Sequence, residues 1–572
     1  MTHDRGQSRI RGERRLHGDY RTRPARLGLL CACAVPVGLM GGGAAWALLH
    51  IIGAITHFAY LGQWGTTLVA PAPAHWGAMA VAIPVLGGLA VGLLARHGSP
   101  RIRGHGIPEA LEVILERDSV MEARVALVKP LASAIAIGTG GPFGAEGPII
   151  VTAGALGSLF AQHLPLTARE RRALLVAGAA AGMSATFGTP VSAVLLAVEL
   201  LAFEWSPRSF LPTALASATA YVVRLATYGP QAVFAAPATP WPSLAGIAAA
   251  VGAGVVMGGL SGALTRLVYA VEDAYRRLPV HWMWWPALGG VAVGLGGWIA
   301  PPTLGVGYPT IQALDAGRML PALAATLGLV KTAIWVVALS SGTSGGVLAP
   351  LLFIGGCAGA LLSPLLPGHL PGLWATVGMA ALLGGTMRAP FTATLFALET
   401  THNWAAALPV FVASMAAAGV TVVWVPWSIL TEKLARRGLH VAREYEVPAW
   451  ERWSVQDALQ RVRSGPAPAV DRQTWDSSLP CVGPGARLRE AIGSMVQHGA
   501  TAVQVVDEHG RPVATLTATE VLHALAPAWQ EEGAAAAPLW GWWRRVRGAQ
   551  APGSHPSAPS SPPAGEEASS SQ

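Results

Sequence analysis

Two segments of the chain repeat one another at a constant offset of 202 residues. Residues 127–157 and 329–359 align without gaps, and both begin with Leu-Val-Lys. Chance similarity between apolar segments does not place a lysine, prolines and glycines in common register, so the sequence indicates an internal duplication. The glycines and prolines that coincide are Gly140 and Gly342, Gly144 and Gly346, Pro148 and Pro350, Gly154 and Gly356, and Gly157 and Gly359.

The duplication continues further along the chain. Residues 189–200 (TPVSAVLLAVEL) match residues 389–400 (APFTATLFALET), with Glu199 aligned on Glu399. Each segment carries a proline at its second position. Because the two glutamates hold equivalent places in both halves, we expect them to make structural hydrogen bonds rather than to contact a transported ion.

The apolar content of the chain is typical of a membrane protein. Hydrophobic residues make up 52% of the 572 residues and charged residues only 12%, whereas about a quarter of the residues of a soluble domain are charged. These values predict an all-α polytopic membrane protein and make transport the first function to consider. About ten apolar stretches, several long enough for two helices, lie at 28–60, 74–96, 125–162, 173–203, 208–227, 240–270, 282–300, 318–340, 345–400 and 404–430.

Residues 1–26 form a basic arm that predicts the orientation of the chain. Eight arginines precede the first apolar stretch, and by the positive-inside rule they keep this end in the cytoplasm. A cleaved signal is the alternative, but the apolar run from Leu27 to Tyr60 is far longer than a signal core. The arm also needs no nucleic-acid partner. We expect a multi-pass protein of the cell (inner) membrane with both termini in the cytoplasm.

Three glycine-rich loops precede short apolar helices. One is GHGIPEA at 104–110, and the other two precede Pro148 and Pro350 in the repeated segments. Proline suits the first turn of a helix, where its missing N–H would be unpaired anyway. The other first-turn N–H groups point into the loop at the positive end of the helix dipole. Three such ends meeting within the membrane would bind an anion.

Glu146 is the only formally charged residue between Lys129 and Arg169. A carboxylate facing lipid there would cost several kcal/mol, so it is expected to face protein or a water-filled path. In the repeat Glu146 aligns with Leu348, so only one of the two equivalent loops carries an acid. The sequence therefore predicts a single functional carboxylate beside helix N-termini, where it competes with an anion.

The sequence resembles the CLC family of chloride channels and proton-coupled anion antiporters over roughly residues 27–440. The resemblance rests on motifs in a fixed order: GHGIP (104–108), GAEGP (144–148), GGVLAP (345–350), and the pair PVSAVLLAVE and PFTATLFALE. It implies a homodimer with one pore in each subunit, and two inverted halves at about 27–230 and 240–430. It also implies that chloride or a related monovalent anion crosses the bilayer.

The resemblance assigns roles to individual residues of these motifs. Glu146 is implied as the gate, whose carboxylate occupies an anion site when ionised and leaves it when protonated. The backbone N–H groups of Gly106, Ile107, Val347 and Leu348 are implied as donors to the anion. The implied anion-binding residues are His105, Gly106, Ile107, Gly147, Val347 and Leu348.

Several positions depart from the family pattern. His105 stands where serine is common, and Leu348 stands where phenylalanine is usual. Leu430 occupies the apparent place of the pore tyrosine, which removes a phenolic donor. Leu200 occupies the place of the antiporters' internal proton-relay glutamate. Because leucine cannot carry a proton, we expect channel-like or weakly coupled transport.

Other functions remain as alternatives at this point. A proton-coupled antiporter is one, with Glu204, His105 or water replacing the missing relay. An unrelated secondary transporter for organic anions shares the repeat but not the motif order. Gly342-Thr343-Ser344-Gly345 also matches the GxSG of intramembrane serine proteases, with His402 as a conceivable base. The repeat explains the same tetrapeptide as a loop before a helix, so no enzymatic activity is expected.

The C-terminal region is polar and is predicted to be a separate cytoplasmic domain at 441–530. Residues 480–525 read as a helix, a hairpin turning at His509-Gly510, and a closing helix. This α/β pattern resembles one CBS motif, in which Thr517 and Glu520 are the candidates for binding adenine nucleotide. A purely structural module is the alternative.

Residues 531–572 complete the chain. They hold the aromatic and basic stretch LWGWWRRVRG (539–548), which is expected to lie on the anionic membrane face. A disordered tail rich in Ser, Pro and Ala is expected to follow. The spacing of the four cysteines predicts neither disulfides nor a metal site.

Overall fold

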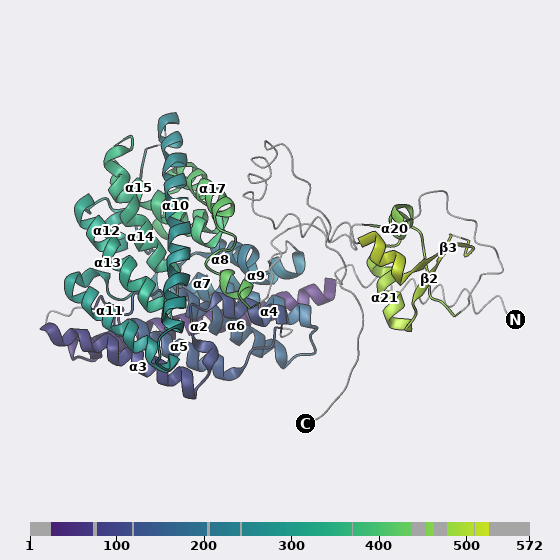
Figure 1. The fold of residues 1–572 in the computed structure, drawn as a ribbon, viewed down its shortest axis with the longest axis horizontal. Coiled ribbons are helices and arrows are strands. Elements are labelled where there is room, and N and C mark those ends of the chain that lie inside the picture. The colour runs from purple at the N-terminus through teal and green to yellow at the C-terminus, as the bar shows by residue number, and fades with distance from the viewer. Residues whose placement is uncertain are drawn as a thin grey trace, which may run out of the picture. The chain divides into compact units, whose positions relative to one another are not determined.

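The computed structural model describes residues 24–71, 77–116, 119–202, 206–240, 243–368, 370–437, 453–462, 478–507 and 509–525. Its contacts divide the chain into two compact units, Met1–Tyr445 and Glu446–Gln572 (Figure 1). The basic arm up to residue 23, Glu204 and the stretch 539–548 lie outside the described residues.

The described residues of the first unit form two sets of eight α-helices that follow each other in the same order. The first set is α2 (Pro24–Thr56), α3 (Ala82–His97), α4 (Ile107–Glu116), α5 (Ala123–Gly138), α6 (Glu146–Gln162), α7 (Ala168–Phe187), α8 (Pro190–Leu196) and α9 (Pro207–Tyr228). The second set is α10 (Leu244–Arg276), α11 (Trp285–Ile299), α12 (Tyr308–Asp315), α13 (Pro321–Ser340), α14 (Leu348–Leu362), α15 (Pro371–Met387), α16 (Pro390–Thr401) and α17 (Ala407–Trp424). A short helix, α18 (Glu432–Ala435), follows.

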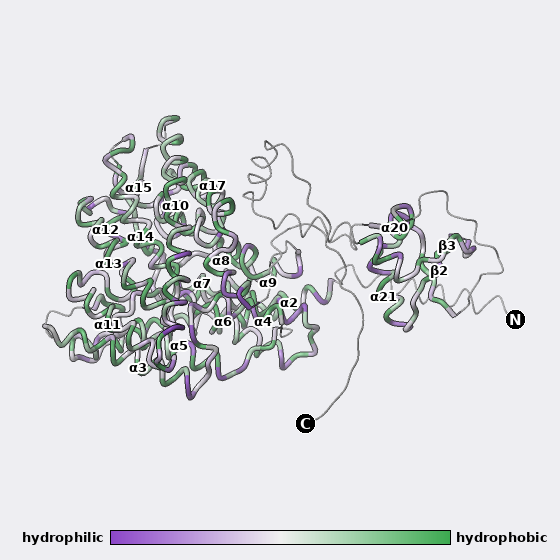
Figure 2. Tube along the Cα trace, in the orientation of Figure 1, coloured by the Kyte–Doolittle hydropathy of each residue, from purple (hydrophilic) through white to green (hydrophobic). Residues whose placement is uncertain are grey.

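Six helical segments are long and apolar enough to cross a membrane, among the residues that the structure describes. Hydrophobic residues run along most of the helices of this unit (Figure 2). As predicted, single apolar stretches hold more than one helix, since 125–162 contains most of α5 and all of α6. Helices such as α4, α8 and α12 are too short to cross a bilayer alone. The predicted polytopic membrane fold with broken helices is confirmed.

The duplication is visible in the hydrogen bonds of two fully buried lysines. Each lysine lies on the helix before a site loop and holds two carbonyl groups of the loop that opens α4 or α12. Buried ammonium groups need such partners, so these residues are structural. Lys129 Nζ donates to the carbonyls of Ile102 and Gly104 at 2.8 and 2.7 Å, and Lys331 Nζ donates to those of Thr303 and Gly305 at 2.8 and 2.7 Å.

Each of the two aligned glutamates caps a helix in the other half of the repeat. Glu399 accepts hydrogen bonds from the backbone N–H groups of Val191 and Ser192 at 2.9 and 2.8 Å, at the start of α8. Glu199 accepts from Thr392 N at 2.8 Å and from its hydroxyl at 2.5 Å, at the start of α16. A carboxylate at a helix N-terminus satisfies donors that the helix leaves unpaired. The predicted structural role of both acids is confirmed.

The second unit contains a small α/β domain. Strand β2 (Ala502–Val506) pairs parallel with β1 (Cys481–Val482) and antiparallel with β3 (Pro512–Thr517), so the sheet order is β1-β2-β3. Helices α20 (Val455–Val462) and α21 (Leu488–His498) belong to the same unit. Gly510 adopts a φ of 75° in the β2–β3 turn, and residues 518–525 form the closing helix. The predicted helix, hairpin and closing helix are confirmed.

Candidate functional site

The three glycine-rich loops meet at one place in the first unit. Gly144 and Gly346 form an antiparallel bridge, with N–H to carbonyl distances of 3.2 and 2.8 Å in the two directions. The loop before α4 joins them, because Gly104 N donates to the Gly342 carbonyl at 3.3 Å. Equivalent loops of the two halves are therefore held backbone to backbone, and the starts of α4, α6 and α14 converge.

Glu146 lies at this junction as the first residue of α6 and is fully buried. Its Oε1 accepts hydrogen bonds from the N–H groups of Leu348 at 2.5 Å and Ala349 at 3.1 Å, while Oε2 has no hydrogen-bond partner among the described residues. These donors are the first two residues of α14. The carboxylate therefore occupies the positive end of a helix from the opposite half of the repeat.

Two glycines make room for this carboxylate. A Cβ added to Gly144 would lie 1.8 Å from Glu146 Oε2, and one added to Gly346 would lie 2.5 Å from Oε1. No side chain fits at either position while Glu146 keeps this conformation. The glycines that the repeat singled out are thus required by the close approach of the acid to both backbones.

The other predicted anion-binding residues lie around the same junction. Ile107, Val347 and Leu348 are each fully buried, and His105 is 6% exposed, with no hydrogen-bond partner on Nδ1 in the part of the chain that the structure describes. Gly147 contacts His105 so closely that an added Cβ would lie 1.9 Å from the His105 carbonyl oxygen. The structure brings these residues together, and their role as anion ligands stays a prediction.

The Gly106 N–H, a predicted anion donor, has a protein partner in this conformation. It donates to Glu109 Oε2 at 2.8 Å, and Glu109 Oε1 accepts from Lys433 Nζ at 2.5 Å. The sequence analysis did not consider Glu109, although its place three residues after the glycine is typical of a carboxylate that binds the first turn of a helix. This ion pair joins the start of α4 to α18.

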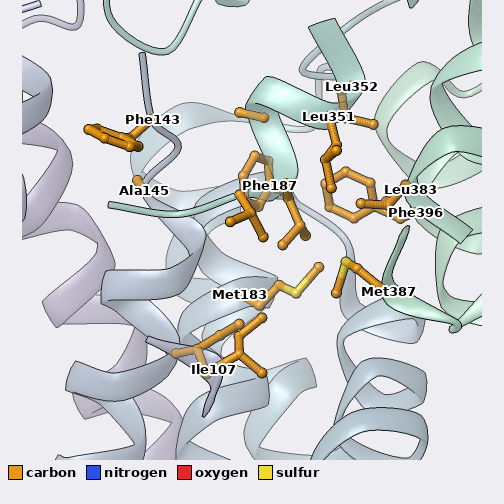
Figure 3. Close-up of a cluster of buried hydrophobic side chains, with 14 of the residues drawn as sticks. Ile107, Phe143, Ala145, Met183, Phe187, Leu351, Leu352, Leu383, Met387 and Phe396 are labelled. Carbon is orange, nitrogen blue, oxygen red and sulfur yellow. The ribbon is translucent and has the colours of Figure 1, made fainter. Parts of the chain in front are cut away.

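Apolar side chains from both halves form a buried cluster next to the junction. Figure 3 shows Ile107 of α4, Met183 and Phe187 of α7, Leu351 of α14 and Phe396 of α16 in this cluster. All five are buried in the main hydrophobic core. Because such a cluster excludes water, the charge of Glu146 and the N–H dipoles interact more strongly than they would in solvent.

Leu200 and Leu430, two of the departures from the family pattern, are buried. Leu200 is 1% exposed in the π-helical segment Ala197–Ala202, and Leu430 is fully buried before α18. Beside Leu430, the Tyr269 hydroxyl of α10 donates to the Ile429 carbonyl at 2.7 Å. The phenol of Tyr269 therefore lies near the position where Leu430 replaces the tyrosine of the family pattern. Its hydroxyl proton is donated to a backbone carbonyl.

A cavity of about 540 Å³ borders His105. The loop before α4, α10, α11, α18 and neighbouring segments contribute to its walls. Its lining is rich in charged and aromatic side chains, which include Arg103, Glu109, Glu272, Trp282, Trp285 and Lys433.

Ser344, the nucleophile of the protease alternative, has a structural partner. It is fully buried and its hydroxyl lies 2.7 Å from the Ser133 hydroxyl. His402 ends α16 as its C-cap residue. The contacts of Ser344 thus provide no general base, and nothing in the geometry supports proteolysis.

Thr517 and Glu520 of the α/β domain hydrogen-bond to each other. Glu520 Oε2 accepts from Thr517 N and Oγ1 at 2.9 Å each, and Thr517 Oγ1 accepts from Glu520 N at 3.2 Å. This reciprocal pattern is a capping box for the closing helix. It gives both residues a structural role, while nucleotide binding stays a prediction.

Comparison with known proteins is consistent with this geometry. The family described as voltage gated chloride channel matches residues 87–422, which is more than half of the chain, and the CBS domain family matches residues 476–527. The ClcB voltage-gated ClC-type chloride channel of Escherichia coli is 31% identical over 331 residues, covering 56% of this chain and 78% of that protein. A ClcB-like chloride channel protein of Ralstonia nicotianae is 29% identical over 341 residues, covering 58% and 80%.

A solved structure has the same fold. The structure of a slow cyanobacterial Cl⁻/H⁺ antiporter superimposes with a TM-score of 0.64 at 24% identity, covering 71% of this chain and 97% of that chain. At this identity the likeness shows the fold alone.

Proposed function

Because this chain belongs to the voltage-gated chloride channel family, whose function is anion transport, we propose that it carries chloride or a related monovalent anion through a pore gated by Glu146. One observation carries the proposal. The Glu146 carboxylate accepts the N–H groups of Leu348 and Ala349 at 2.5 and 3.1 Å, in a place where a free anion would find the same donors.

The gate then works by competition for backbone donors. While Glu146 is ionised, its carboxylate fills the positive end of α14 and excludes another anion. Protonation removes the negative charge that the helix end favours, so the side chain leaves and an anion takes its place. Backbone donors hold the anion without a full positive charge, which keeps binding weak enough for release.

Transport is proposed to be channel-like, or only weakly coupled to protons. Leu200 supports this, because it is buried at the position where a proton relay would need an acid. The cluster of apolar side chains next to the junction supports it too, since none of them can carry a proton. Proton-coupled antiport is the second candidate, favoured by the likeness of the fold to a Cl⁻/H⁺ antiporter. Glu204, which could supply another acid, lies outside the described residues.

Chloride flux from liposomes that contain the purified protein tests both anion transport and weak coupling to protons. Wild-type protein is expected to release chloride, and Glu146→Ala to release it with a weaker dependence on pH. Asp507→Asn, which removes a 38%-exposed carboxylate of the α/β domain, serves as the control and should retain the wild-type pH dependence. Absence of flux for every monovalent anion would refute anion transport. Uphill proton uptake at a fixed ratio to chloride would refute weak coupling.

The protein is further proposed to be a homodimer with cytoplasmic termini. Apolar side chains are exposed on α8, α9 and α16, for example Val191 at 53%, Leu215 at 41% and Phe391 at 50%. A second copy or lipid would have to cover such a surface. Light scattering of the detergent-solubilised protein, corrected for detergent, should give twice the 59.0 kDa chain mass, and the monomer mass would contradict this.

A further inference from the structure

Arg103 is held by two tryptophans at the wall of the cavity next to His105. Its guanidinium carbon lies 4.6 Å from the centre of the Trp282 ring and 5.6 Å from that of Trp285. Stacking on aromatic faces fixes a guanidinium while leaving the N–H groups, which lie in the plane of the guanidinium, available for hydrogen bonds. The two tryptophans thus orient the cation without neutralising it.

The other basic residues that line the cavity are ion-paired, whereas Arg103 forms no salt bridge in the described part of the chain. Its Nε is buried without a hydrogen-bond partner. Glu272 is close enough to influence Arg103 electrostatically, but its carboxylate bonds to Arg276 at 2.6 Å. The remaining pairs are Lys433 with Glu109 at 2.5 Å, Arg436 with Asp273 and Glu432 at 2.7 and 2.9 Å, and Arg437 with Glu112.

The position of Arg103 links the cavity to the gate region. Arg103 precedes Gly104 and His105 in the loop that opens α4, and a Cβ added to Gly342 would lie 3.0 Å from its Nη2. His105, 6% exposed, lines the same cavity and has no partner on Nδ1. An uncompensated cation and an unpartnered imidazole nitrogen therefore border one space of about 540 Å³.

We propose that this cavity is a second anion site, in which Arg103 binds oxyanions in preference to halides. A planar guanidinium offers parallel N–H groups that match two oxygens of nitrate, bicarbonate or a carboxylate. A spherical halide cannot use this two-point geometry. The cavity is large enough for the bound anion to keep part of its hydration. The assignment rests on the proposed function only in taking the protein to carry anions.

Calorimetric titration of nitrate into the full-length protein in detergent, against a constant chloride background, tests the site. Wild-type protein is expected to bind nitrate with a half-saturating concentration at least about tenfold lower than Arg103→Gln, the loss expected for a charge-assisted contact. Arg103→Lys keeps the positive charge but not the parallel N–H groups of the guanidinium, so it should give an intermediate half-saturating concentration. Arg266→Gln is the matched control, since Arg266 also lies over a tryptophan, 4.5 Å from the Trp424 ring centre, outside the cavity.

Identical nitrate isotherms for the wild type and Arg103→Gln would overturn the proposal and leave Arg103 as a packing residue. If Arg103→Gln does not fold, as judged by its elution and thermal unfolding, the comparison rests on Arg103→Lys, and a wild-type isotherm for that variant overturns the oxyanion preference. Binding does not depend on flux. If the wild-type protein binds nitrate but transports no anion, only the proposed function is contradicted. If the wild-type protein transports anions and Arg103→Gln binds nitrate as the wild type does, only the second anion site is contradicted.

Discussion

Gly147→Ala tests whether the loops before α4 and α6 must touch. The added Cβ would lie 1.9 Å from the His105 carbonyl oxygen and 3.1 Å from Gly346 Cα. Ordinary contacts begin near 3.4 Å, so the backbones must separate by about 1.5 Å. Both neighbours are backbone atoms and cannot rotate away as a side chain could. We expect the start of α6 to move, together with the acid at its first position.

The same substitution at Gly154, also on α6, provides a matched control. There the new Cβ would lie 3.4 Å from its nearest neighbour, the Leu175 carbonyl oxygen. Replacing glycine by alanine within a helix stabilises it by up to about 1 kcal/mol, whereas forcing atoms into a packed core costs about 1–3 kcal/mol. The two variants should therefore differ by about 1–4 kcal/mol, with Gly154→Ala the more stable.

Thermal unfolding in detergent and chloride flux from liposomes measure the two consequences. Gly147→Ala should unfold at a lower temperature than Gly154→Ala and lose most of its flux, whereas Gly154→Ala should transport like the wild type. Wild-type flux and stability in Gly147→Ala would refute the close approach of the loops.

Two further predictions concern hydrogen bonds outside the gate. Glu399→Ala leaves two backbone N–H groups of α8 unpaired and should cost about 2–5 kcal/mol, with Glu399→Gln costing less because it keeps one acceptor; equal thermal destabilisation by both variants would contradict the cap. In the α/β domain, the N–H groups of Arg511 and His509 lower the pKa of Asp507 from its ordinary 3.8. Its stabilisation is therefore present above about pH 3.8 and lost as the pH falls further. Hydrogen exchange of the 507–511 amides in the full chain should show that loss, and protection unchanged down to pH 2 would argue against it.

Most of the predictions made from the sequence rest on its internal repeat. It located the helix-start loops, paired Glu199 with Glu399 and marked Glu146 as a single acid, because glycines, prolines and charges follow local rules that are visible in sequence. The membrane fold followed from the apolar content. These features depend on short segments and their spacing.

Contacts between distant segments were not predictable in the same way. Ala349 donates to Glu146 only because α6 and α14 begin at the same point in space. The Gly106 N–H is taken by Glu109, and the Tyr269 hydroxyl lies beside Leu430 through packing of α10. The stacking of Arg103 also depends on how α11 meets the loop before α4. A sequence pattern cannot specify such neighbours without the tertiary fold.

Crystals of Glu146→Gln grown in bromide test the central claim most directly. If the carboxylate occupies an anion site, its neutral replacement should admit bromide, and anomalous scattering should place the ion within hydrogen-bond distance of the Leu348 and Ala349 N–H groups. An unoccupied α14 N-terminus, with bromide bound elsewhere in the first unit, would contradict the assignment of Glu146 as the gate.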